Sequence, residues 1–277
     1  MYQSHCSIIE DILLILTEHI NMRIPKEKQY PNVPISIILL TCNRKDNARI
    51  TINELYKRVK YSDKIHLIVV DDESTDGTLE LLREKKKEGK IDVLIESKNF
   101  KNVSLAYNEG FKYVKSDYFI CTQDDITPPK LEPKDVIEQL QDLMEKYPDH
   151  GGIGCRIERI QNMHWEEGDL SRARKSLAAY FRIQTKEDYE KMGMLPSRDW
   201  DDVAFLGRVR KVLKKECSWS THLWASHARG YGKDRGYLVL PKKWGIGIHS
   251  RDKQDYERKP YPEIDPITNV PLKLLKK

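Results

Sequence analysis

The sequence has few cysteines and no apolar stretch of the length of a membrane span. Its five cysteines are odd in number, widely spaced and without a CxxC pair: Cys6, Cys42, Cys121, Cys155 and Cys217. This pattern argues against a disulfide framework and against a cysteine zinc site. The strongest apolar run, residues 12–16, falls far short of the roughly 18–20 residues that a transmembrane helix needs and lacks the flanks of a secretory signal. We therefore expect a cytoplasmic protein without an integral membrane span.

Length and charge exclude other classes. The 277 residues fit one large domain with appendages better than two full domains. Lys and Arg total 48 and Asp and Glu total 43, so the net charge is only +5, less lopsided than in most proteins that coat nucleic acid. We expect an N-terminal helix and linker at 1–33, a main domain at 34–250 and a charged, Pro-rich tail at 251–277. The apolar N-terminal helix would pack against the body or against a second copy in a homodimer.

Short apolar runs alternate with helical segments along the main domain. Continuous aliphatic runs predict buried strands at 35–40, 65–70, 93–95, 118–121 and 151–157, with a later strand at 237–240. Helices are expected at 48–60, 79–87, 105–114 and 202–215. Residues 158–176 are polar and are expected to form a mobile loop. This order predicts an α/β fold with a mostly parallel central sheet flanked by helices.

Polar clusters follow three of the predicted strands directly. They are Thr-Cys-Asn at 41–43, Asp-Asp at 71–72 and Asp-Asp at 124–125. Each cluster alone could be a turn or a helix cap. In parallel α/β sheets, however, ligands bind outside the carboxyl ends of the strands. Three clusters at equivalent positions therefore indicate a ligand site.

The order of these motifs resembles glycosyltransferase family 2, whose members have the Rossmann-like GT-A fold. The resemblance covers roughly residues 34–250. Five segments carry it: ISIILLTCNR (35–44), LIVVDDESTDGT (67–78), SLAYNEGFKYVKSDYFICTQDDITP (104–128), DWDDVAFLGRVRK (199–211) and LPKKWGIGIH (240–249). It implies an inverting enzyme that moves a sugar from a nucleotide-diphosphate donor, UDP-sugar by default, to the hydroxyl of a glycan, small-molecule or DNA acceptor.

The resemblance also implies a divalent metal, Mn²⁺ or Mg²⁺, which would offset the charge of the diphosphate and prefers carboxylate oxygens. Asp125 is the expected direct ligand, and Asp124 is expected to bind the donor sugar, the ribose or a metal-bound water. The match lacks an earlier aspartate, since Thr122 or Gln123 stands there. His249 matches a late histidine that completes the metal site. The alternative is that both aspartates only cap a helix.

Further donor contacts follow from the same resemblance. Asp72 matches the residue that contacts the nucleotide base, and Asp71 is expected to brace its loop through backbone N–H groups. Thr41 and Asn43 match the loop that wraps the base. Asn108 matches a ligand-binding region, although a packing role for it is equally consistent with the sequence.

The acidic pair Asp201 and Asp202 opens a predicted helix, and Arg208 follows at the interval seen in the family. Asp202, the second acid, would be the general base that takes the proton of the acceptor hydroxyl. Simple capping of the helix is the alternative for either residue. If the base lies elsewhere, Glu166 and Glu167 in the 158–176 loop are the next candidates.

Three other functions stay open from the sequence. A basic helix is followed by Trp219 and Trp224, and such residues could bind phosphates and stack on bases. The sequence is therefore also consistent with a DNA-modifying glycosyltransferase that acts on a hydroxymethylated base. A catalytically silent domain that binds sugar nucleotides or partners would be a different class, but the set of acids argues against it. A nucleotidyltransferase would need a Gly-rich phosphate loop, which residues 41–44 do not supply.

Overall fold

The computed structural model describes residues 34–97, 102–156, 168–195 and 201–227. Its main feature is an eight-stranded sheet in the order β3-β2-β1-β4-β8-β6-β9-β7. The strands are β1 (Ile35–Thr41), β2 (Ile65–Asp72), β3 (Val93–Ser97), β4 (Tyr118–Gln123), β6 (His150–Arg156), β7 (Leu170–Arg172), β8 (Arg182–Thr185) and β9 (Glu216–Trp224). A second, two-stranded sheet pairs β5 (Ile126–Thr127) with β10 (Ser226–His227).

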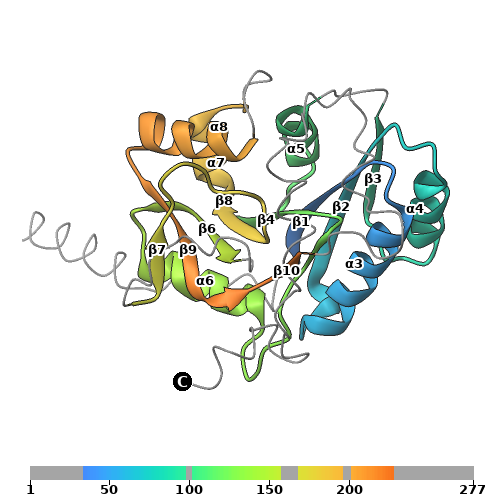
Figure 1. The fold of residues 1–277 in the computed structure, drawn as a ribbon, viewed down its shortest axis with the longest axis horizontal. Coiled ribbons are helices and arrows are strands. Elements are labelled where there is room, and N and C mark those ends of the chain that lie inside the picture. The colour runs from blue at the N-terminus through green and yellow to red at the C-terminus, as the bar shows by residue number, and fades with distance from the viewer. Residues whose placement is uncertain (1–33, 98–101, 157–167, 196–200, 228–277) are drawn as a thin grey trace, which may run out of the picture.

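Helices cover both faces of the sheet (Figure 1). They are α3 (Lys45–Arg58), η1 (Ser62–Lys64), α4 (Thr78–Lys87), α5 (Val103–Phe111), α6 (Val136–Lys146), α7 (Lys186–Met192), α8 (Asp201–Arg208) and the π-helical turn η2 (Val209–Leu213). Side chains of α3, α4 and α6 pack into one apolar cluster, and those of α5, α7 and α8 pack into another on the opposite face. Strands β1 and β2 are buried on both faces, which explains their mainly aliphatic sequences.

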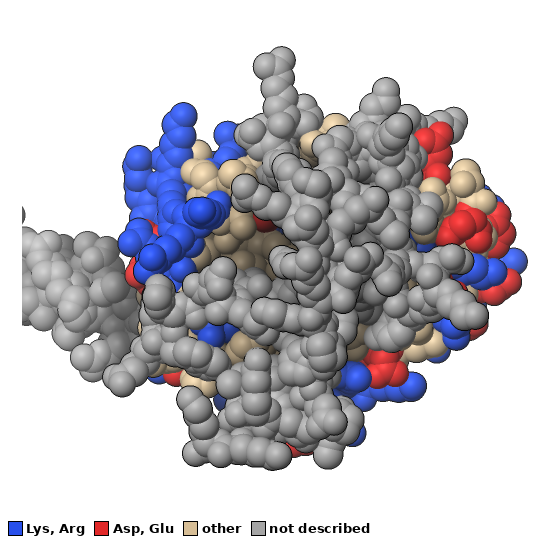
Figure 2. All heavy atoms as spheres, viewed as in Figure 1, with Lys and Arg blue, Asp and Glu red and all other residues tan. Residues whose placement is uncertain are grey.

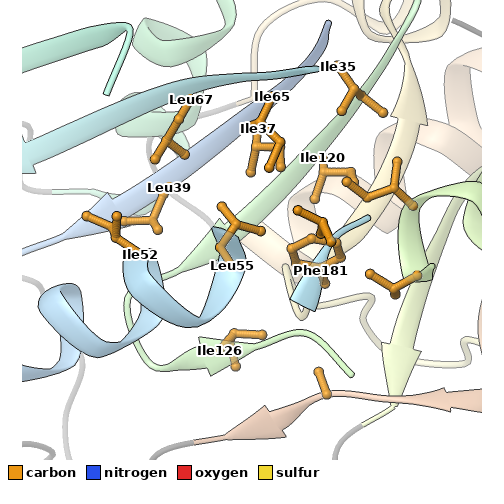
Figure 3. Packing of buried hydrophobic residues seen from close by; sticks show 14 of the residues in the cluster. Ile35, Ile37, Leu39, Ile52, Leu55, Ile65, Leu67, Ile120, Ile126 and Phe181 are labelled. Atoms are coloured by element: carbon orange, nitrogen blue, oxygen red, sulfur yellow. The ribbon is translucent and has the colours of Figure 1, made fainter. Parts of the chain in front are cut away.

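The first cluster shows how the strands alternate between the two cores. Ile35, Ile37 and Leu39 of β1 belong to the same cluster as Ile52 and Leu55 of α3 (Figure 3). The intervening Ile38 and Leu40 belong to the second cluster. This alternation follows from the two-residue period of a strand.

The strand order places a topological switch point between β1 and β4. Strand β1 pairs in parallel with β2 on one side and with β4 on the other. The chain therefore winds in opposite directions from this point, and ligands of open α/β sheets bind at such a switch. The register sets Leu40 beside Gln123, so Thr41 and Asp124 leave the sheet next to each other.

The predicted α/β class and mostly parallel sheet are confirmed, and the strands predicted up to residue 157 are all present. The predicted helix at 202–215 is present as α8 and η2. Strands β7, β8 and β9 are additional, and antiparallel pairs link β8 to β4 and β6, and β7 to β9. Strand β7 falls within the predicted 158–176 loop. The N-terminal helix, the strand at 237–240 and the tail lie outside the described residues, so the domain limits stay a prediction.

None of the described helices combines the length and apolarity that a bilayer crossing requires.

Candidate active site

The site is built at the ends of β1 and β4. The Thr41 hydroxyl donates a hydrogen bond to Asp124 Oδ2 at 2.7 Å, and the Asp124 backbone N–H donates to the Leu40 carbonyl at 3.0 Å. From α3, the Thr51 hydroxyl donates to the Asp124 carbonyl at 2.6 Å. Asp124 and Asp125 are both almost completely buried. The backbone and one carboxylate oxygen of Asp124 are thus fixed by the sheet and by α3.

One arginine bridges the two carboxylates. Arg44 Nη1 lies 2.9 Å from Asp124 Oδ1 and 2.8 Å from Asp125 Oδ2. Arg44 stands just before α3, where its carbonyl accepts the N–H of Ala48 and its own N–H donates to Thr78 Oγ1 at 3.1 Å. Only 11% of its side chain is exposed. Sequence reasoning did not include Arg44 in the site.

A histidine contacts the same carboxylate from the second sheet. Strand β10 pairs with β5 so that His227 lies opposite Ile126, the residue after Asp125. His227 Nε2 is 3.1 Å from Asp125 Oδ2, and its side chain is buried. The sequence prediction placed the metal-site histidine at His249, which lies outside the described residues. The structure therefore adds His227 as a histidine of this site.

The two adjacent carboxylates differ electrostatically. Burial raises the pKa of Asp124 to about 6, helped by the negative charge of Asp125 and opposed by Arg44 and Thr41. Burial also raises the pKa of Asp125, but His227 and Arg44 act on it more strongly together and hold that pKa well below its ordinary value. Asp125 is therefore the more acidic of the two carboxylates.

The cluster has the chemistry of a site for a hard divalent cation. It offers carboxylate oxygens and one imidazole, which are the ligand types that Mg²⁺ and Mn²⁺ accept. Asp125 Oδ1 is buried and accepts no hydrogen bond from any described residue. Within the described ranges, no three His, Cys, Asp or Glu side chains are already assembled as a metal site. In this structure Arg44 supplies the positive charge beside the two carboxylates, and the ligand types present are those that a divalent cation accepts.

The loop after β2 lies beside this cluster. Asp72, the last residue of β2, is buried next to Ser97 of β3. Asp71 Oδ2 accepts the Ser74 N–H at 3.0 Å, which is the bracing role predicted for it. Asn43 joins this loop to β1, because its N–H donates to Ser74 Oγ at 2.8 Å and its Oδ1 accepts the Thr75 N–H at 2.6 Å. Thr41, Asn43, Asp72 and Asp124 are thus gathered around one end of the sheet.

Asn108 is used in packing between helices. Its Oδ1 accepts hydrogen bonds from the Tyr189 hydroxyl at 3.0 Å and from the Leu195 N–H at 2.9 Å, and its Nδ2 donates to the Leu195 carbonyl at 2.9 Å. Three of the four hydrogen bonds of the amide are therefore made within the protein. This is the packing role that the sequence left open, and contact of Asn108 with the donor stays a prediction.

Asp201 and Asp202 begin α8, as the sequence predicted. Asp202 is half-buried, its Oδ1 accepts the Val203 N–H at 2.9 Å, and its carbonyl accepts the Leu177 N–H at 3.2 Å. Phe205 fixes α8 on the sheet, because the Arg182 guanidinium of β8 lies 3.8 Å from its ring centroid. The α8 start is thus anchored while the Asp202 side chain reaches solvent. Glu166 and Glu167, the alternative bases, lie outside the described residues.

The basic helix predicted after Asp202 is partly neutralised. Arg210 contacts Glu216 at 3.1 Å and Lys215 contacts Asp188 at 2.8 Å. Figure 2 shows Lys and Arg side chains gathered where Figure 1 places the far end of α8 and η2. We call this surface the basic face; its exposed members are Arg172, Arg174, Lys175, Lys211 and Lys214.

A family model described as "Glycosyl transferase family 2" matches residues 36–198. The chain belongs to glycosyl transferase family 2. The matched range includes most of β1, the Asp72 loop and the Asp124–Asp125 pair, whereas Asp202 and His227 lie beyond it. The predicted enzyme class, a glycosyltransferase, is confirmed.

Two curated archaeal proteins are similar to this chain over part of their lengths. One, from Methanococcus voltae, is named dolichyl N-acetyl-alpha-D-glucosaminyl phosphate 3-beta-D-2,3-diacetamido-2,3-dideoxy-beta-D-glucuronosyltransferase; it is 28% identical over 48% of this chain and 42% of its own. The other, a dolichol-phosphate mannosyltransferase from Pyrococcus furiosus, is 31% identical over 36% of this chain and 28% of its own. The chain thus matches less than half the length of either relative.

Among solved structures, the mannosyltransferase PcManGT from Pyrobaculum calidifontis, in complex with GDP-Man and Mn²⁺, has a similar fold. It superposes with a TM-score of 0.59 at 16% identity, covering 82% of this chain and 65% of that one. The predicted GT-A fold is therefore confirmed.

Proposed function

We propose that this glycosyltransferase is metal-dependent and inverting, and that it uses a nucleotide-diphosphate sugar, with UDP-sugar as the default donor. The observation that carries the proposal is the buried cluster of Asp124, Asp125 and His227 at the β1–β4 switch point. Buried carboxylates at that place need positive charge. A diphosphate with its cation would supply the matching ligand.

On this proposal, the end of the sheet holds the donor. Asp72 would accept a hydrogen bond from the nucleotide base, and Asn43 would hold the loop that wraps it. Asp125 and His227 would hold the cation, with Asp124 beside them. The role of His249 as a metal ligand stays a prediction beside that of His227. When bound, the cation neutralises charge on the leaving diphosphate. The mannosyltransferase with the similar fold was solved with GDP-Man and Mn²⁺, which supports this donor class.

Asp202 would act on the acceptor. Its carboxylate would take the proton of the attacking hydroxyl while that oxygen bonds to the anomeric carbon and the bond to the diphosphate breaks. Attack from the face opposite the leaving group inverts the anomeric centre.

For the acceptor, we propose a glycan attached to a phosphate group. The two curated relatives are named for dolichol-phosphate substrates, and the basic face follows directly after α8. Its exposed side chains would attract an anionic acceptor toward Asp202. A hydroxymethylated DNA base, kept open by the sequence, has no further support from the described residues.

The test is binding of the donor with and without metal. Hydrolysis of UDP-, GDP- and TDP-sugars in Mn²⁺ first identifies the nucleotide. Calorimetry of that nucleotide then compares wild type, Asp125→Ala and the control Asp63→Ala, whose side chain is 76% exposed. We expect Asp125→Ala to abolish the enhancement by Mn²⁺ and Asp63→Ala to keep it. Wild-type enhancement in a folded Asp125→Ala variant would refute the metal assignment.

A further inference from the structure

Arg44 makes an unusual contact for a residue beside a cation site. A single nitrogen, Nη1, lies within 2.9 Å of both Asp124 and Asp125. It contacts the same Asp125 Oδ2 that lies 3.1 Å from His227 Nε2. A guanidinium stays protonated at every physiological pH. Arg44 and a divalent cation therefore compete for the same carboxylate oxygen.

The carboxylates do not depend on Arg44 alone for their position. Asp124 is held by the Thr41 hydroxyl, by the Thr51 hydroxyl and by the backbone of β1. Asp125 follows it directly and is flanked by the β5–β10 pair. If the Arg44 side chain moves, these anchors remain, and a buried pair of negative charges is left to attract another cation.

Arg44 is also well placed to move without disturbing the helix that follows it. Its backbone is fixed by the α3 hydrogen bond to Ala48 and by Thr78. Only the long side chain reaches the carboxylates. Arginine is suited to bind phosphate oxygens with its planar donors, so a released guanidinium would find a partner in the diphosphate.

From these contacts we propose that Arg44 is an exchangeable counter-ion. It neutralises Asp124 and Asp125 before the donor arrives, gives way to the divalent cation that accompanies the donor, and then binds the diphosphate. This inference rests on the proposed metal dependence. Its consequence is an order of binding: the free protein holds the cation weakly, and the cation enters together with the nucleotide diphosphate.

The experiment measures Mn²⁺ binding in the absence of nucleotide, by electron paramagnetic resonance of free Mn²⁺. Wild type is compared with Arg44→Gln, which removes the charge, and Arg44→Lys, which keeps it. Arg49→Gln is the matched control, because Arg49 lies on α3 with half of its side chain exposed and pairs with Asp46. Circular dichroism checks that each variant is folded.

We expect Arg44→Gln to bind Mn²⁺ alone at least about tenfold more tightly than wild type, since a competing charge has been removed from a buried site. Its affinity for UDP with Mn²⁺ should fall. Arg44→Lys and Arg49→Gln should bind Mn²⁺ alone as weakly as wild type. If Arg44→Gln proves unstable, Mn²⁺ should raise its melting temperature more than that of wild type.

Two results would overturn the exchange. If Arg44→Gln binds Mn²⁺ no better than wild type, while Asp125→Ala still loses the Mn²⁺-dependent binding of UDP, the metal site stands and the exchange is wrong. If UDP binds wild type equally well with and without Mn²⁺ and Arg44→Gln abolishes that binding, Arg44 is the permanent cation. In that case both the exchange and the proposed metal dependence fail.

Discussion

The acidic side chains of two regions are held in different ways. One region, which we call the β1–β4 edge, comprises the carboxyl ends of strands β1 and β4; the other is the start of α8. At the β1–β4 edge, Asp124 and Asp125 are buried and held by Thr41, Arg44 and His227. At the start of α8, Asp202 is half-buried and its carboxylate accepts the N–H of the next residue. The first arrangement fixes negative charges in advance, as the proposed binding of a cation together with a diphosphate requires. The second leaves a carboxylate accessible, as proton transfer from an arriving acceptor requires.

The sheet shows the same contrast. Strands β1, β2, β3 and β4 form a parallel block whose ends meet at one edge. Beyond β4 the pairs become mixed, and register shifts interrupt the pairing of β6 with β9. Parallel strands place their carboxyl ends at one edge of the sheet, whereas the strands of the mixed half run in both directions. We infer that donor binding depends on the first half and acceptor choice on the second.

The largest effect is expected for a substitution of Asp202, which should lower turnover without changing donor affinity. Asp202→Asn keeps the size of the side chain but removes the proton acceptor, so turnover should fall by about 10²–10⁴-fold. Donor affinity, measured by calorimetry, should stay near the wild-type value because the β1–β4 edge is untouched.

Asp201→Asn is the matched control for this experiment. Its turnover should stay within severalfold of wild type, with at most about 1 kcal/mol lost from stability if Asp201 acts as a cap. If Asp201→Asn loses turnover while Asp202→Asn keeps it, the two roles are exchanged. If both keep it, the base lies elsewhere, and Glu166 and Glu167 become the candidates.

Alanine substitutions at two glycines test how tightly the two regions are packed. A Cβ on Gly110, in α5, would lie 2.6 Å from Ile38 Cγ2 of β1, whereas a Cβ on Gly207, in α8, would have no neighbour within 4 Å. Gly110→Ala should therefore lower the free energy of unfolding by about 1–3 kcal/mol. Gly207→Ala should raise it by up to about 1 kcal/mol through helix propensity. Urea denaturation measures both, and equal shifts in the two variants would remove the packing contrast.

The smallest expected effect concerns the basic face. The double substitution Lys211→Glu and Lys214→Glu should raise KM for a phosphate-bearing acceptor severalfold. The effect is small because each surface charge contributes about 1 kcal/mol or less to the free energy of binding. Turnover at saturation and donor affinity should not change. The difference from wild type should shrink at high salt. The control is the double substitution Lys57→Glu and Lys60→Glu on the opposite side of the sheet, and an equal effect there would show a general charge response.

Binding of duplex DNA, measured at two salt concentrations, tests the alternative acceptor. A strongly salt-dependent affinity would support a DNA acceptor.

The parallel block was predictable from sequence because its strands are mainly apolar runs, and β2 and β4 lead directly into paired aspartates. Ile35–Thr41 and Ile65–Asp72 match the predicted runs closely, since strands buried on both faces are mostly aliphatic, with Ser36 and His66 as isolated polar residues. Asp124 and Asp125 were recognised for the same reason, as they follow a run of this kind. Strands β7, β8 and β9 were missed because they are short or carry mixed polar and apolar residues.

Arg44 and His227 were not predicted because their roles arise from long-range contacts. Arg44 is 80 residues away from Asp124 in sequence, and His227 is 102 residues away from Asp125. Only the β1–β4 register and the β5–β10 pair bring these side chains together. Sequence patterns within one segment carry no signal for such a meeting. His227 follows the end of β9 at Trp224 by three residues, and nothing in that local sequence marks it as a neighbour of Asp125.

The central claim is that Asp125 and His227 together hold the cation of the donor complex, and one measurement tests it directly. Calorimetry of the nucleotide diphosphate with and without Mn²⁺ should be made on His227→Ala and on His222→Ala, the control from β9 whose side chain is 67% exposed. We predict that His227→Ala loses at least about tenfold of the enhancement by Mn²⁺, since even indirect supports of metal ligands are worth about 10–100-fold. His222→Ala should keep the full enhancement. Wild-type enhancement in a folded His227→Ala variant would contradict the claim.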